Sequence, residues 1–107
     1  MSNKVSVIYT TIDSEEKATD LAKRALTEKV ATCVNMIPQG KSIYIWDEKI
    51  AESQEWYLIF KTSPERLDSL EKWLQKHHPY EVAAILKLTV DSSKAFASYI
   101  SSYVETS

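Results

Sequence analysis

The sequence predicts an α+β fold in which two strand-helix-strand units share one antiparallel sheet. Segments with the alternation of strands take turns with segments of helical periodicity, in the order strand, helix, strand, strand, helix, strand, helix. The 107 residues are 44% hydrophobic, which suffices for one buried core, and no linker or repeat divides them. We therefore expect a single domain over residues 1–107, a split βαβ sandwich of the ferredoxin-like kind with a short C-terminal helix.

The first strand and helix are predicted over residues 4–29. Residues 4–11 alternate with a period of two and are rich in strand formers. Asp13, followed three residues later by Glu16, resembles the capping box that opens a helix. Apolar side chains then recur at helical spacing, at Ala18, Leu21, Ala22, Ala25 and Leu26. We expect this helix over about residues 14–29.

A long central β-hairpin is predicted next. Residues 30–37 and 42–46 are strand-like around a break at Pro38 and Gly40, and residues 54–62 form the following strand. Extended residues 30–46 would span about 50 Å, whereas a 100-residue domain has a radius of gyration of about 13 Å. Both sides of the hairpin are apolar, so we expect an oligomer in which neighbours cover it. The alternative is that Pro38 and Gly40 bend the ribbon back over its own domain.

The second half of the chain repeats the pattern. Ser63 is a candidate N-cap before Pro64, and Pro79 forbids continuation of the helix. One face of this helix holds Leu67, Leu70, Leu74 and His77. A strand over residues 82–90 follows, and the last helix carries Phe96, Tyr99, Ile100 and Tyr103.

Charge and cysteine content narrow the class of protein. The net charge is −2, with 13 basic residues scattered among 15 acidic ones, so we expect no nucleic-acid partner. No apolar run has the length of a membrane span, and the chain starts without an apolar signal region, so we expect no membrane insertion. The single Cys33 forms no internal disulfide, which fits a reducing compartment. A cytoplasmic protein is the expectation.

The only two histidines, His77 and His78, are adjacent at the end of the second helix. Imidazole is the commonest protein ligand for transition metals, so the pair is a candidate metal site. The structural alternative is that a histidine in the last helical turn interacts with the helix dipole. Neighbouring side chains point about 100° apart on a helix, so the two rings can share one ion only if the turn is irregular.

Four blocks of sequence resemble the CutA family of divalent-cation tolerance proteins. They are ATCVNMIP at residues 31–38, SIYIW at 42–46, FKT at 60–62 and HHPYE at 77–81. The resemblance runs from about Val5 to Ile100 and implies a ferredoxin-like protomer in a homotrimer, with long hairpins wrapping neighbouring subunits. It also implies an architecture similar to the trimeric PII signalling proteins, with ligands in clefts between subunits. The candidate cleft residues are Trp46, Lys61, Tyr80 and Glu81.

The resemblance also implies a metal site. Some family members bind copper through the paired histidines, which His77 and His78 match, and through a first-strand cysteine, which is Thr10 here. Without that thiolate, an imidazole site suits copper(II) or another divalent transition metal better than copper(I). Two further departures from the family pattern stand at Ala83-Ala84, where a proline and a glutamate are usual, and at the hairpin turn, where Glu48 replaces a glycine.

No catalytic set is visible in the sequence. The loop after the first strand, residues 10–14, carries Asp13 where an acylphosphatase-like enzyme needs a glycine-rich loop with an arginine. The chain also lacks the basic, aromatic sheet signature of RNA-recognition modules. We therefore predict no enzyme. The prediction is a homotrimeric divalent-cation tolerance protein that binds transition-metal ions such as copper and takes part in the response to them. The alternative is a PII-like trimeric adaptor or small-molecule signalling protein with incidental metal binding.

Overall fold

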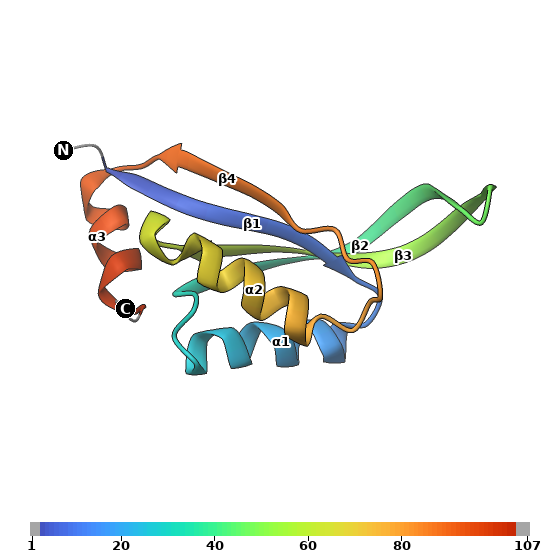
Figure 1. The fold of residues 1–107 in the computed structure, drawn as a ribbon, viewed down its shortest axis with the longest axis horizontal. Coiled ribbons are helices and arrows are strands. Elements are labelled where there is room, and N and C mark those ends of the chain that lie inside the picture. The colour runs from blue at the N-terminus through green and yellow to red at the C-terminus, as the bar shows by residue number, and fades with distance from the viewer. Residues whose placement is uncertain (1–2, 105–107) are drawn as a thin grey trace.

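Four strands form one antiparallel sheet in the order β2-β3-β1-β4. The structure, a computed structural model, describes residues 3–104. The elements are β1 (Lys4–Ile12), α1 (Glu15–Thr27), β2 (Cys33–Trp46), β3 (Lys49–Thr62), the 3-10 turn η1 (Pro64–Arg66), α2 (Leu67–His77), β4 (Leu86–Asp91) and α3 (Lys94–Ser102). Helices α1 and α2 lie side by side beneath the sheet, and α3 stands at its far end (Figure 1). This arrangement confirms the predicted ferredoxin-like sandwich.

The core lies between one face of the sheet and the helices α1 and α2. Side chains of β1 and β3 alternate between the two faces, so every second residue points to these helices. The fully buried members are Ile8, Ile12, Leu58, Phe60, Leu70 and Leu74. Burial of each such side chain contributes about 1.5–3 kcal/mol. Helix α3 instead packs on Val5 and Val7, which alternate with Ile8, so it contacts the other face of the sheet.

Several predicted boundaries are wrong by a few residues, among them the start of β3, which is Lys49 instead of residue 54. The N-cap of α1 is Ser14, whose hydroxyl accepts a hydrogen bond from the Lys17 amide, so the predicted capping box at Asp13 does not form. Pro64 opens a 3-10 turn rather than the α-helix, which starts at Leu67. The last strand starts at Leu86 instead of residue 82, because pairing with β1 begins there. The residues before it form the connection from α2.

The hairpin of β2 and β3 projects beyond the rest of the molecule (Figure 1). With the hairpin included, the longest dimension is 47 Å. Both strands have 14 residues and meet at a two-residue turn, in which Asp47 and Glu48 have φ angles of 49° and 63°. Positive φ at both positions is the geometry of tight hairpin turns, and Glu48 holds it without glycine. The alternative in which the ribbon folds back over its own domain is wrong.

A β-bulge interrupts the hairpin where the sequence predicts a break. The register of β2 and β3 shifts between Ile37 and Gly40, and Gln39 has a φ of 60°. The ring of Tyr57 crosses directly over Gly40, and its hydroxyl donates to the Lys41 carbonyl at 3.2 Å. A β-carbon at Gly40 would overlap that ring. Because Gly40 has no side chain, the Tyr57 ring can lie over its backbone, at the point where the ribbon leaves the sheet.

Much of the hairpin and the free face of the sheet is apolar and exposed. The exposed fractions are 65% for Ile43, 69% for Ile45 and 75% for Ile50. On β4, Leu86 and Leu88 are also exposed. Apolar surface of this extent is uncommon on a monomer. In residues 3–104, no helix is both long and apolar enough to span a membrane.

Replacement of Gly40 by alanine should destabilise the protein by about 1–3 kcal/mol, because the new methyl group competes with the Tyr57 ring for the same space. The cost should shrink in a Tyr57→Leu background, where that ring is absent. Chemical denaturation of the four proteins of this double-mutant cycle, at one protein concentration, measures the coupling. Equal costs in both backgrounds would show that the ring is not the cause.

Candidate functional site

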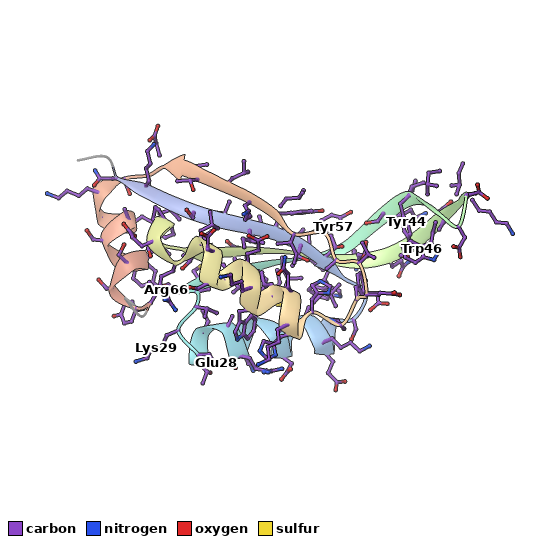
Figure 2. The ribbon with its side chains drawn as sticks, viewed as in Figure 1. Glu28, Lys29, Tyr44, Trp46, Tyr57 and Arg66 are labelled. Carbon is purple, nitrogen blue, oxygen red and sulfur yellow. The ribbon has the colours of Figure 1, made fainter. Side chains whose placement is uncertain are left out.

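A pocket of about 510 Å³ extends from the base of the hairpin along the ribbon, between the hairpin, β1 and the connection after α2. Its volume is within the range of small-molecule sites, about 300–1,000 Å³. Four aromatic side chains and three carboxylates stand among its lining residues: Tyr9, Tyr44, Trp46, Tyr80, Asp13, Glu55 and Glu81. Figure 2 shows Tyr44 and Trp46 on the projecting ribbon. The walls of the pocket are thus aromatic, and its charged groups are all acidic.

Glu55 is the buried carboxylate of this pocket. It is only 6% exposed, and the Tyr80 hydroxyl donates a hydrogen bond to its Oε2 at 2.7 Å. Burial raises the pKa of Tyr80, and the hydrogen bond to Glu55 raises that pKa further. The phenol therefore stays protonated at neutral pH and remains a donor to the carboxylate. Glu55 and Tyr80, 25 residues apart in the chain, thus form one hydrogen-bonded pair in the lining of the pocket.

His78 holds Tyr80 in place. The Tyr80 amide donates to His78 Nδ1 at 3.1 Å, so the proton of the neutral ring sits on Nε2, which donates to the Thr11 carbonyl at 3.0 Å. The ring also meets the Tyr80 ring edge-on, with 4.9 Å between centroids. Burial lowers the pKa of His78, although the Thr11 carbonyl acts in the opposite direction. His78 is therefore a neutral, fully hydrogen-bonded ring.

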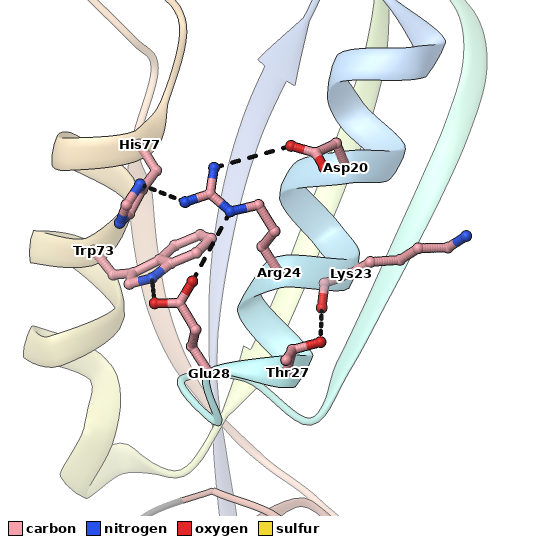
Figure 3. A network of polar contacts seen from close by, with 7 residues as sticks. All are labelled: Asp20, Lys23, Arg24, Thr27, Glu28, Trp73 and His77. Carbon is pink, nitrogen blue, oxygen red and sulfur yellow. Dashed lines mark hydrogen bonds and ion pairs between the residues drawn. The ribbon is translucent and has the colours of Figure 1, made fainter.

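His77 faces α1 instead (Figure 3). Its Nδ1 lies 3.0 Å from the guanidinium of Arg24, and its ring packs on Trp73 with 4.6 Å between centroids. Because a guanidinium only donates hydrogen bonds, Nδ1 must accept this one. The Trp73 indole donates to Glu28 at 3.0 Å, and Arg24 lies 3.9 Å from Glu28 and from Asp20. His77 thus belongs to a polar network that joins α1 to α2.

The two histidines do not meet at a common centre. Their rings turn to different partners, as expected for neighbours at a helix end, and each ring uses its Nδ1 as an acceptor. Within residues 3–104, no group of three or more histidine, cysteine, aspartate or glutamate residues is placed to hold a metal ion. Thr10 is fully buried in the core. Metal binding by His77 and His78 stays a prediction, and it would require at least one ring to release its present partner.

The structure brings together three of the four predicted cleft residues. Trp46, Tyr80 and Glu81 line the pocket, whereas Lys61 lies near α3, where its ammonium group donates to Asn35 and is 5.6 Å from the Phe96 ring. Ala84, one of the departures from the family pattern, also lines the pocket.

Four of the aromatic and acidic lining residues were not predicted from the sequence: Tyr9, Asp13, Tyr44 and Glu55. Two signals were present in the sequence. Glu55 directly precedes the apolar run at residues 56–60. Tyr44 lies on the same side of the ribbon as Trp46, because side chains alternate along a strand.

Together these features define a ferredoxin-like sandwich protein with a projecting hairpin and an acidic, aromatic pocket at its base. The model of the family described as CutA1 divalent ion tolerance protein matches residues 6–103. The chain belongs to this family.

Relatives and solved structures agree with this assignment. The divalent-cation tolerance protein CutA of Yersinia pestis (strain Pestoides F) is 35% identical over 100 residues, which cover 92% of this chain and 83% of the relative. A CutA homolog of Xenopus laevis is 35% identical over 91 residues, covering 85% of this chain but only 60% of the longer frog protein. The structure of CutA from Synechococcus elongatus PCC7942 superposes with a TM-score of 0.91 at 34% identity, covering 98% of this chain and 95% of that one.

A fourth protein bears on location. The structure of the periplasmic divalent cation tolerance protein CutA from Archaeoglobus fulgidus has a TM-score of 0.88 at 33% identity, covering 94% of this chain and 99% of that chain. Because this neighbour is described as periplasmic, the cytoplasmic location expected from the sequence stays a prediction.

His78 should make stability depend on pH. As the pH falls through about 6.5, the unfolded chain takes up a proton at this residue, whereas the folded protein, in which the pKa is lowered, takes it up only at lower pH. The free energy of unfolding should therefore decrease as the pH falls from 7.5 to 5.5. Urea titrations at fixed protein concentration should show a smaller decrease for His78→Gln. The same decrease in both proteins would assign the pH dependence to other groups.

Proposed function

We propose that this protein acts as a homotrimer in tolerance to divalent cations, by binding rather than by catalysis, and that it binds transition-metal ions, with copper(II) as the first candidate. Membership of the CutA1 family and the names of the relatives support the role in cation tolerance. The observation that carries the assembly is the uncovered apolar hairpin.

The assembly follows from surface chemistry. Ile43 and Ile45 extend into solvent on a ribbon that no other part of the described chain covers, and Leu86 and Leu88 are exposed on β4. An exposed apolar ribbon with a free edge promotes uncontrolled association unless a specific partner covers it. Copies of the same chain are the simplest partners, because closed symmetric oligomers are the most common solution. The number three rests on the resemblance to the CutA family.

The metal proposal concerns His77 and His78. Imidazole and carboxylate ligands without a thiolate favour copper(II) or zinc over copper(I). A ring that binds metal must offer a lone pair, so His77 would have to release Arg24, or His78 the Tyr80 amide. Further ligands would come from a neighbouring subunit, and the exposed Glu81 is a candidate on this side of the protein.

A second candidate function is that of a PII-like trimeric adaptor or small-molecule signalling protein in which metal binding is incidental. One observation favours it. The chain has a pocket of small-molecule size, whereas residues 3–104 contain no preformed group of three metal ligands.

Native mass spectrometry of metal-free protein titrated with copper(II) and with zinc tests the metal proposal. We expect a trimer that takes up about one ion per chain, and loss of that uptake in the His77→Ala/His78→Ala variant with the trimer intact. Cys33→Ser is the matched control and should bind like the wild type, because its thiol is not part of the proposed site. A trimer that takes up no ion would favour the second candidate.

Substitution of apolar hairpin residues by charged ones tests the proposed trimer. Ile43→Lys/Ile45→Lys should dissociate the trimer, because both side chains are exposed in one chain and would be buried only between copies. Size-exclusion chromatography with light scattering measures the mass. Lys72→Glu, an equally polar change on the exposed face of α2, should leave the trimer unchanged. A monomeric wild-type protein would contradict the proposal outright.

A further inference from the structure

We propose that the pocket at the base of the hairpin binds an organic ammonium ion, with Glu55 as its counterion and the rings of Tyr44 and Tyr80 as its walls. This inference concerns the ligand class of the pocket and rests on the proposed trimer only in that the pocket must stay open to solvent there. It does not depend on metal binding by the histidines.

The first argument is charge. Asp13, Glu55 and Glu81 line the pocket, and none of the lining residues is a lysine, arginine or histidine. Glu55 is 6% exposed, and the ion pairs found within residues 3–104 all involve other carboxylates. Its hydrogen-bond donor, Tyr80, is a neutral hydroxyl. Because burial of an uncompensated carboxylate is costly, a bound cation would stabilise this arrangement.

The second argument is the aromatic walls. The negative faces of tyrosine and tryptophan rings attract cations, and alkylated ammonium groups bind best to several such rings together. The rings here are held in place by polar contacts. The Tyr44 hydroxyl shares a hydrogen bond of 2.6 Å with Ser53 across the hairpin, and Tyr80 is fixed by His78 and Glu55. The pocket therefore offers rings that are already oriented.

The third argument is that the pocket suits an organic cation better than a metal ion. A bare divalent cation needs several oxygen or nitrogen ligands converging at about 2.0–2.6 Å, and residues 3–104 contain no such group. The pocket has a volume of about 510 Å³, far more than one ion fills. An alkylammonium group satisfies both conditions, because it is bulky, apolar at its surface and positively charged.

The tyrosines do not add negative charge at neutral pH. Burial raises the pKa of Tyr80 and of Tyr9, and the charge of Glu55 raises both pKa values further. The charge that faces the ligand is therefore that of the carboxylates alone.

Isothermal titration of the protein with choline, and with its uncharged isostere 3,3-dimethylbutan-1-ol, tests the proposal. We expect choline to bind at least about tenfold more tightly, because the two molecules differ only in charge. Glu55→Gln should weaken choline binding by a similar factor, since glutamine still accepts the Tyr80 hydrogen bond but carries no charge. Glu52→Gln is the matched control, because Glu52 is an exposed carboxylate on the same strand that pairs with Lys41. Its choline affinity should equal that of the wild type.

The aromatic wall has its own test, which does not disturb the buried carboxylate. Tyr44→Leu should weaken choline binding, whereas Tyr44→Phe, which keeps the ring, should retain it. Equal binding of choline and its isostere, or wild-type affinity in Glu55→Gln, would overturn the proposal.

Light scattering on the same samples measures the oligomeric state, so that the ammonium-site proposal and the trimer proposal can be tested separately. A trimer that binds no choline overturns the ammonium site alone and would indicate that a cationic side chain of a neighbouring copy fills the pocket. A monomer that binds choline supports the site and contradicts the assembly.

Discussion

The pairing of β3 with both β1 and β2 fixes the positions of the core, the pocket and the hairpin relative to one another. From Tyr57 to Lys61, β3 pairs with both β1 and β2, and its side chains Leu58 and Phe60 fill the core. Before Trp56 the partner β1 has ended, and β3 pairs with β2 alone. Glu55 is the first residue past this boundary, opposite Gly40 at the bulge. The pocket therefore forms where the four-stranded sheet gives way to a two-stranded ribbon.

The sequence predicts the parts of this structure that rest on local periodicity. Alternation and helical spacing give the order of elements, the long hairpin and the break at Pro38. The N-cap at Ser14 was not predicted because Asp13 is an equally good N-cap, and local sequence does not rank the two. The start of β4 was missed because residues 82–85 are apolar enough for a strand, and only pairing with β1, some 75 residues away, decides where the strand begins.

The candidate site was predictable only in part, for the same reason. Trp46 and Tyr80 come from segments that stand out in the sequence, but Glu55 gains its role from a contact with Tyr80 that no local pattern reveals. The histidines show the converse. His77 closes α2 while His78 is already extended, so two adjacent imidazoles enter separate hydrogen-bond networks. The two histidines are therefore adjacent in sequence but do not form a common site within one chain.

The bulge also has a mechanical consequence. Beyond Glu55 the ribbon has only two strands, whereas the sheet that it joins has four. Any bending of the ribbon should therefore occur mainly at the bulge near Gly40. Tyr44 and Trp46 lie on the projecting ribbon, whereas Glu55 and Tyr80 lie where the ribbon joins the sheet. Any force that deflects the tip of the ribbon therefore changes the width of the pocket. A molecule that binds at the hairpin turn would therefore affect the pocket through the ribbon that connects the two.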